Sequence, residues 1–503
     1  MKKIIDDYKK LFNKTEYKDM FDKKKTLYED PCDDKKILET LEWSKSKEYK
    51  ELNFSRKNVV INPLKACQPL GALYAAAGIK NTMPYVHGSQ GCAAYFRSHF
   101  SRHFKEPFIA VSDSMTEEAA VFGGLNNMIE GLLNAYNIYK PEMFAVCTTC
   151  MAEVIGDDLN NFIKKAKDEG SIPVDFPIVF AHTPSFIGSH IVGYDNMLTS
   201  ILTQLGKKDE SKHNDSINII LGFDTYIGDF KEIKRICDAF DISYNLLSDP
   251  SEILDSPADG TFNMYRGGTP IEVIENAPNA KGTILLQKYS LRKVKELIEN
   301  DWGQPVKVIN PIGIDGSDEL IMAISEMSGK KIPKEFEDER GRAIDAISDS
   351  YYHVYGKTFS LNGDPDISIG ITKFLLELGG NINHILLTNG SKLWKREIGE
   401  ILDKNNSKDT EVYSDKDLWH FRSLLFEKPS DFIIGNSYAK FLSKDTSIPL
   451  IRIGFPISDR HHYHRYSIIG YNGVINLLVW IVNAILDEED RTLVNTPGYD
   501  VIK

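Results

Sequence analysis

Three cysteines stand where the chain is expected to pass from one element to the next. Cys150 ends the apolar run 143–150, which stops at small polar residues before an acidic helix start. Such a strand-to-helix corner is where open α/β sheets hold ligands. Cys67 and Cys92 are each flanked by Gly or Pro, which let a backbone approach a bulky inorganic group closely. Because thiolates bind metals, we predict one metal-cluster site that uses all three thiols.

The spacing of these cysteines limits the kind of metal site. They lie 25 and 58 residues apart, which matches neither a zinc motif nor a ferredoxin motif. Three thiolates are also too few to close a four-ligand cluster, so we expect further ligands from another chain. Cys147 and Cys150 form a Cys-x-x-Cys pair, but Cys147 lies within the strand, where packing is expected rather than thioredoxin-like chemistry. Cys32 and Cys237 are interpreted as packing residues too.

Other groups of ionisable residues have ordinary explanations when taken alone. Asp345 and Asp349 lie four residues apart on one helical face, as on a solvated helix surface. The histidine-rich run 459–464 lacks regular metal-ligand spacing and is more typical of an interface. The sequence contains no Gly-x-Gly-x-x-Gly, and the Gly-Lys-Thr at 356–358 has Tyr351 where a phosphate-binding loop needs glycine. We therefore expect no nucleotide binding by this chain.

The composition is that of a soluble globular protein. The chain has 503 residues, 42% of them hydrophobic, and its net charge of −12 argues against general nucleic-acid binding. The first residues do not form a secretory signal, and the longest apolar run, 473–486, is too short and interrupted for a membrane span. Six cysteines in so long a chain predict a reducing cytoplasm rather than a disulfide framework.

Alternating strands and helices must position the cysteines. A strand-loop-helix pattern fills residues 59–210, and strands alternate with helices again through 211–340 and 341–503. This pattern predicts an α/β fold of three consecutive doubly wound, Rossmann-like domains with mostly parallel sheets. Residues 1–58 are rich in charged and aromatic side chains. We expect a helical arm that packs on a partner subunit, with a partly disordered tail as the alternative.

Two short segments near the cysteines carry local signals. Ser114-Met-Thr-Glu117 fits a capping box that would open the helical run 119–122, and two glycines at 123 and 124 then interrupt the pattern. Adjacent glycines indicate a turn or a close backbone approach. The strand 178–181 leads into another corner that contains Ser185, and a hydroxyl in such a place is most often a helix cap.

Several long runs of the sequence carry a resemblance to a known family. They are residues 62–71 around Cys67, 83–92 ending at Cys92, 112–124, 148–158 around Cys150, 182–186 and 452–456. Together they span nearly all of the chain after residue 58. In these runs the chain resembles the beta chain of the nitrogenase molybdenum-iron protein.

The resemblance implies a metal cluster shared between subunits. In that family two alpha and two beta chains form a tetramer, and an [8Fe-7S] P-cluster lies between each alpha and beta chain, with three cysteines from each. By position, Cys67, Cys92 and Cys150 match the beta-chain ligands, and Cys92 matches the one that bridges the cluster halves. Ser185 matches a serine that binds an iron in the oxidised cluster.

The resemblance implies two further sites. Glu106, the Lys105 carbonyl, Asp345 and Asp349 match a mononuclear cation site, for iron or calcium, between two beta chains. The family commonly has Arg where this chain has Lys105, a difference that a backbone-carbonyl ligand tolerates. Phe122 matches a residue at the docking surface for the iron protein, a homodimer that hydrolyses ATP.

The implied activity is electron relay, with no catalytic side chain on this chain. Electrons from the iron protein, which receives them from reduced ferredoxin or flavodoxin, would pass through the P-cluster to the iron-molybdenum cofactor of the alpha chain, where N2 becomes ammonia. Three alternatives stay open. A beta-like scaffold subunit of cofactor assembly usually lacks the full cysteine trio, and light-independent protochlorophyllide reductase lacks the 112–124 run. Vanadium or iron-only nitrogenase is nearer, although the long N-terminal arm favours the molybdenum class.

Overall fold

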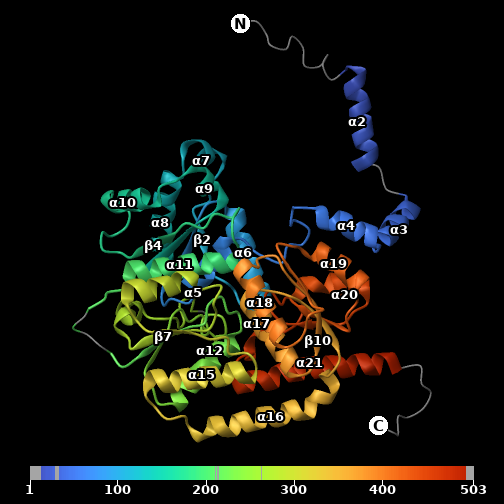
Figure 1. Cartoon of the computed structure of the whole chain (residues 1–503). Helices are drawn as coiled ribbons and strands as arrows, with labels where there is room; N and C mark the ends of the chain where they lie inside the picture. Colours follow the sequence, from blue (N-terminus) through green and yellow to red (C-terminus); the bar gives the residue numbers. More distant parts are fainter. Residues whose placement is uncertain (1–12, 29–32, 210, 212–213, 262, 494–503) are drawn as a thin grey trace. The chain divides into compact units, whose positions relative to one another are not determined.

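The computed structural model describes residues 13–28, 33–209, 211, 214–261 and 263–493, so that Cys32 lies outside the described part. The chain divides into two compact units, residues 1–57 and 58–503 (Figure 1). The described residues of the first unit form the helices α2 (Thr15–Tyr28), α3 (Asp34–Trp43) and α4 (Lys47–Ser55). Its large apolar side chains, including Leu38 and Trp43, are exposed. A helical arm is therefore confirmed, and its partner stays a prediction.

The second unit begins with a four-stranded parallel sheet of order β2-β1-β3-β4. Successive side chains along a strand point to opposite faces of the sheet, so they pack alternately against the two layers of helices that cover it. Along β3, Ala145 and Cys147 pack in the same apolar cluster as α5 and α11, whereas Phe144 and Val146 pack with α8 and α10. The elements are β1 (Thr82–His87), β2 (Val111–Ser112), β3 (Met143–Thr148), β4 (Ile178–Ala181), α5 (Gln68–Ala77), α6 (Gln90–Phe104), α7 (Glu117–Phe122), α8 (Leu125–Tyr139), α9 (Cys150–Ile155), α10 (Leu159–Asp168) and α11 (His190–Leu205).

A second parallel sheet follows, with order β6-β5-β7-β8. Its two central strands, β5 and β7, are buried on both faces, which explains why they are mostly apolar. The elements are β5 (Ile217–Ile220), β6 (Tyr244–Leu246), β7 (Gly282–Leu285), β8 (Val306–Val308), α12 (Ile227–Ala239), α13 (Ile271–Asn276), α14 (Arg292–Leu297) with a π turn (Ile298–Trp302), and α15 (Gly313–Ser328).

The third sheet has five parallel strands in the order β11-β10-β9-β12-β13. The long helix α16 (Lys334–Val354) precedes it, and α21 (Gly470–Leu493) follows it. The remaining elements are β9 (Thr358–Asn362), β10 (Asn381–Leu387), β11 (Glu411–Ser414), β12 (Phe432–Gly435), β13 (Leu450–Arg452), α17 (Pro365–Glu377), α18 (Lys392–Lys404), α19 (Leu418–Glu427) and α20 (Lys440–Thr446). Three successive parallel sheets confirm the predicted fold class.

Helix α21 is long and apolar enough, by length and composition alone, to cross a membrane between Gly470 and Thr492. On the inner face of the helix, Val474, Leu477 and Ile481 are instead completely buried in the main core. The helix contacts α15, α16 and β13. Its Asn476 side chain donates to the Ser467 carbonyl at 2.9 Å. These contacts describe a core helix.

The predicted capping box at Ser114 is wrong. Helix α7 begins at Glu117, and its N-cap residue is Thr116, which makes no side-chain capping bond. Ser114 instead adopts a left-handed backbone, with φ of 53°, and its N–H donates to the Ser112 hydroxyl at 3.0 Å. Ser114 therefore belongs to a tight turn before the helix.

Candidate functional site

Helices α5 and α11 cross with their backbones in contact, and this crossing fixes the position of Cys67. A Cβ atom on Gly71 would lie 1.7 Å from the His190 carbonyl oxygen, and one on Gly193 would lie 1.8 Å from the Gln68 carbonyl oxygen. No side chain fits at either position. Cys67 is the N-cap residue of α5 and makes no capping bond of its own, which leaves the thiol available.

Gln68 joins the start of α5 to the turn that contains Ser185. The Gln68 side chain is almost completely buried, and its Nε2 donates to the carbonyls of Pro184 and Ile187 at 3.1 and 2.9 Å. Its Oε1 accepts from Asn196 Nδ2 at 2.7 Å. No local sequence pattern marks this role, because it depends on two segments more than 110 residues apart.

Ser185 is not a helix cap. Helix α11 begins at His190, and its N-cap residue is Ser189. The Ser185 side chain instead hydrogen-bonds the Cys67 thiol, which acts to lower the pKa of that thiol against the larger, opposite effect of burial. The hydroxyl that resemblance assigned to the cluster is thus beside one of the three predicted ligands.

Thr183 joins the same turn to the end of β3. Its N–H donates to the Thr148 hydroxyl at 2.8 Å, and its own hydroxyl donates to the Thr148 carbonyl at 2.7 Å. Both threonines are buried. Since Cys150 follows Thr148 by two residues, these bonds hold the Ser185 turn against the Cys150 corner.

All three cysteines lie at helix starts. Cys67 precedes α5, Cys92 lies in the first turn of α6, and Cys150 is the first residue of α9. The partial positive charge at a helix start favours a thiolate. Strands β1 and β3 are neighbours in the sheet and lead into α6 and α9, so Cys92 and Cys150 occupy adjacent corners.

The thiols are close enough to affect one another. Burial raises the pKa of the Cys67 thiol, and the charge of Cys150 raises it further. Burial also raises the pKa of the Cys92 thiol, to which Cys150 and Cys67 both add. Cys150 is exposed, whereas the other two are half-buried. Three thiolates that repel one another at a partly open surface are stabilised when positive metal ions bind between them.

The arrangement fits a cluster of several metal atoms better than a single ion. Among the residues that the structure describes, no group of three or more His, Cys, Asp or Glu is placed to hold one metal ion. In a multi-iron cluster each thiolate binds different iron atoms, so the sulfurs need not converge on one point. Cys147 and Cys237 are completely buried among apolar side chains, as predicted for packing residues.

Phe122 ends helix α7 at the surface, with 83% of its area exposed. Helices α7 and α9 lie side by side (Figure 1) and pack through Met115, Ala119 and Ala152. Val121 and Val154 are also about three-quarters exposed, at 75% and 76%. We call Val121, Phe122 and Val154 the apolar ridge.

The residues of the predicted cation site lie on two separate elements. Lys105 ends α6 in the left-handed conformation, and Glu106 follows it, half-buried. Asp345 and Asp349 are exposed on α16. Within the described ranges, none of these three carboxylates forms an ion pair in the chain. They stay candidates for a site that needs a second copy.

Comparison with known proteins identifies the family. A family model described as nitrogenase component 1 type oxidoreductase matches residues 67–486. The chain belongs to this nitrogenase component 1 family. A second model, for a domain of unknown function, matches residues 1–53.

Curated relatives at about half identity cover almost the full length of this component 1 chain. The nitrogenase molybdenum-iron protein beta chain of Nostoc sp. strain PCC 7120 is 53% identical, over 98% of this chain and 97% of the relative. The beta chain of Azotobacter vinelandii is 51% identical, over 98% of each chain. The recognition from sequence is therefore confirmed.

Solved nitrogenase structures share the fold. One chain of nitrogenase Cp1 at pH 6.5 superposes with a TM-score of 0.86 at 38% identity, covering 89% of this chain and 98% of its own. A chain of nitrogenase Cp1 at pH 5 gives a TM-score of 0.66 at 19% identity, covering 88% and 92%. The second likeness concerns the fold alone.

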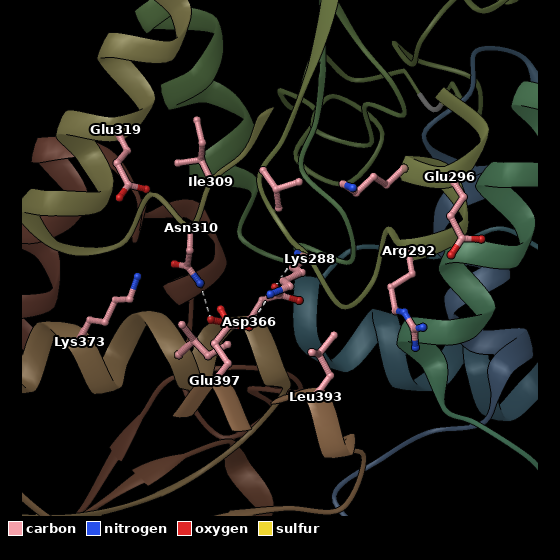
Figure 2. Close-up of a pocket in the computed structure, with 13 residues that line it drawn as sticks. Lys288, Arg292, Glu296, Ile309, Asn310, Glu319, Asp366, Lys373, Leu393 and Glu397 are labelled. Atoms are coloured by element: carbon pink, nitrogen blue, oxygen red, sulfur yellow. Dashed lines mark hydrogen bonds and ion pairs between the residues drawn. The ribbon is translucent and has the colours of Figure 1, made fainter. Parts of the chain in front are cut away.

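This component 1 chain also contains a cavity of about 350 Å³ that none of the cysteines lines. It lies beyond the ends of β7 and β8 and is lined on one side by Arg292 and Glu296 and on the other by Glu319 and Lys373 (Figure 2). Asp366 lies between these walls, where its carboxylate accepts the Lys288 N–H at 2.6 Å. Burial raises the pKa of Asp366 to about 7.

Proposed function

We propose that the chain is the beta subunit of a molybdenum nitrogenase and holds half of an [8Fe-7S] P-cluster. The observation that carries the proposal is the set of three mutually repelling thiols at helix starts beside one sheet, with a serine hydroxyl on one of them. The trio is incomplete by itself, which fits a cluster completed by the alpha chain.

In this proposal Cys67, Cys92 and Cys150 bind the cluster, with Cys92 bridging its two halves, and Ser185 is an additional ligand in the oxidised state. When bound, the cluster would take up and release electrons with little rearrangement, because bridging sulfides spread the charge. Gln68 and Thr183 orient the Ser185 turn, and the α5–α11 crossing keeps Cys67 in place. No side chain of this chain performs bond chemistry on N2.

The partners follow from the same proposal. Two alpha and two beta chains assemble, and the iron-molybdenum cofactor lies in the alpha chain. The iron protein, reduced by ferredoxin or flavodoxin and driven by ATP, docks on the apolar ridge. An exposed aromatic flanked by aliphatic side chains is the kind of anchor that transient interfaces use.

Further assignments belong to this proposal. Glu106, the Lys105 carbonyl, Asp345 and Asp349 would hold an iron or calcium ion between two beta chains. The domains would be residues 59–210, 211–340 and 341–503, after an arm at 1–58 that packs on a partner. The protein would work in the cytoplasm, without nucleic acid or membrane.

Anaerobic purification of the chain with its alpha partner tests the proposal. We expect iron and molybdenum in the complex, which would separate it from a vanadium enzyme and from a scaffold subunit. Cys92→Ala should lose the P-cluster iron and weaken the contact with the alpha chain together, because buried iron sites would be left without a ligand.

Cys237→Ala is the matched control, because it removes a buried thiol from α12, beside the second sheet. It should retain its iron. A full iron complement in Cys92→Ala would contradict the bridging role.

A further inference from the structure

One buried histidine, at the end of β1, connects two segments that follow β2 and α9. His87 is the last residue of β1 and has no exposed surface. Its Nδ1 makes a short hydrogen bond to Asp113, which follows β2, and its Nε2 lies 3.0 Å from Asp157 Oδ2, which follows α9. The two carboxylates approach the ring from its two nitrogens. Both contacts are made at once when the ring carries two N–H groups.

Each carboxylate also holds a backbone N–H of glycine. Asp113 Oδ1 accepts from Gly88 at 2.9 Å, at the start of the loop that leads to Cys92. Asp157 accepts from Gly124 at 3.3 and 3.1 Å, immediately after the helix that ends at Phe122. The histidine thereby joins the Cys92 loop to the end of the helix that carries the apolar ridge.

The packing around the ring leaves little freedom. A Cβ atom on Gly124 would lie 2.6 Å from His87 Cε1 and 2.8 Å from Asp157 Oδ2. The His87 carbonyl accepts from the Thr149 N–H at 3.1 Å, one residue before Cys150. Because these groups are already in direct contact, a movement of α7 or α9 would displace the His87 ring.

The two carboxylates beside the ring favour its protonated form. Burial acts to lower the pKa of His87, but the hydrogen bonds and charges of Asp113 and Asp157 outweigh it and raise the pKa. Asp113 and Asp157 are the charged groups that face the ring from the elements packed on it. Phe162, from α10, covers the ring edge-on with 6.0 Å between centroids.

We propose that His87, bridged between Asp113 and Asp157, is a positioning residue that couples the apolar ridge to the loops that carry Cys92 and Cys150. Docking of a partner on α7 and α9 would then affect the positions of the cluster ligands, although the partner would not contact the cluster. This inference rests on the proposed function, and it adds a connection that the ligand set alone does not require.

Hydrogen exchange on the unmodified tetramer tests the coupling first. With the iron protein bound, exchange at Gly124 and at Gly88 should slow together, because both amides bond carboxylates on one ring. The peptide around Ile138, on the exposed part of α8, is an internal reference. Slower exchange at Gly124 with no change at Gly88 would overturn the proposal.

Asp157→Asn tests the bridge in the assembled tetramer. The side chain keeps its size but loses its negative charge and one of its two acceptor oxygens, so it cannot hold both the ring and the Gly124 N–H as the carboxylate does, and the affinity for the iron protein should fall about tenfold. The midpoint potential of the cluster in the isolated tetramer should shift as well. Asp158→Asn is the matched control, because the neighbouring Asp158 caps α10 through Asn161 N–H at 3.1 Å, and asparagine caps equally well.

The outcomes separate the two hypotheses. A parent tetramer without iron, or without affinity for the iron protein, would contradict the proposed function. A normal parent with Asp157→Asn identical to it in both affinity and potential would overturn the coupling alone. His87→Gln is a second variant, since glutamine cannot reach both carboxylates: loss of iron with unchanged affinity per intact tetramer would show that the ring supports only the cysteine loops.

Discussion

At the residue scale, Ser185 stands out because its hydroxyl already contacts the Cys67 thiol in the folded chain. A hydroxyl is a hard donor, and once deprotonated it binds iron best when the iron is oxidised. The Cys67 thiolate and the Ser185 alkoxide would then differ in the oxidation states of the cluster in which they bind iron. The thiolate would stay throughout, and the alkoxide would bind only on oxidation.

Ser185→Ala should remove the pH dependence of the cluster's oxidation potential, because oxidation would no longer release the serine proton. For one proton per electron the parent slope is about 59 mV per pH unit, which redox titration at several pH values measures. The reduced cluster should assemble normally. Ser189→Ala is the control, because Ser189 begins α11 without a side-chain capping bond. Equal slopes in parent and Ser185→Ala would count against ligation by Ser185.

Asp366 offers a residue-scale prediction independent of the cluster. Burial raises its pKa to about 7 in the folded chain. The carboxyl has a higher pKa in the folded chain than in the unfolded chain, where it is near 4. The folded chain is therefore relatively most stable below pH 4, and it loses this stability as the pH rises toward 7. The loss is of the order of 4 kcal/mol for about three pKa units.

Asp366→Asn should therefore flatten the fall in thermal unfolding midpoint between pH 5 and pH 8. The amide oxygen can still accept the Lys288 N–H. Asp175→Asn, at an exposed position, should leave the fall as it is in the parent. A parallel fall in parent and Asp366→Asn would assign the pH effect to other groups.

At the scale of elements, short helices carry the surface that the iron protein is proposed to use. Helices α7 and α9 have six residues each and share a small apolar cluster of their own. Their stability depends on that packing and on the bonds from Asp157, since isolated helices of this length do not form in water.

Phe122→Ala should lower the affinity for the iron protein about tenfold or more, because a central exposed aromatic contributes most to a transient interface. The cluster spectrum should stay intact, because the side chain is exposed at the surface. Ile138→Ala, which removes an exposed apolar side chain from α8, is the control for surface apolarity. Loss of the cluster signal in Phe122→Ala would show a structural role instead.

Some elements could be predicted and others could not. Strands buried on both faces, such as β3 and β5, give continuous apolar runs, and the parallel sheets followed from them. Strand β2 has only two residues, too few for any periodicity. The capping box is absent because the Ser112 hydroxyl accepts the Ser114 N–H, which the Glu117 side chain would accept in a capping box. Local sequence does not report such competition.

At the scale of the whole molecule, the proposed cluster site would be divided between chains. Cys67 and Cys92 stand out in the sequence by their Gly and Pro surroundings and Cys150 by its strand-to-helix corner, and the structure places the three close enough for their charges to interact. Their role as cluster ligands stays a prediction. Gln68, Thr183 and His87 act through residues that are distant in sequence, so no local pattern marks them. Among the described residues, the carboxylates of the predicted cation site form no group placed to hold a metal ion.

Replacing both Asp345 and Asp349 with Asn should weaken the association between beta chains and release the bound ion. Carboxylates brought together from two chains repel unless a cation lies between them, and amides bind it less tightly. Analytical ultracentrifugation and metal analysis are the measurements. A control with Glu335→Gln and Asp338→Asn changes two exposed acids on the same helix. Unchanged mass and ion content would leave Asp345 and Asp349 as a solvated surface.

The crossing of α5 and α11 forms only after a delay during synthesis, because its two helices are far apart in the sequence. Ala66 and His190 are 124 residues apart, yet the Ala66 N–H bonds His190 Nδ1 in the finished fold. A ribosome adds roughly 5–20 residues per second, so roughly 6 to 25 seconds separate the synthesis of these two residues. During that interval Cys67 emerges from the ribosome tunnel without its crossing partner, as an oxidisable thiol. Oxygen or a foreign metal encountered during synthesis would therefore damage this protein before any cluster is inserted.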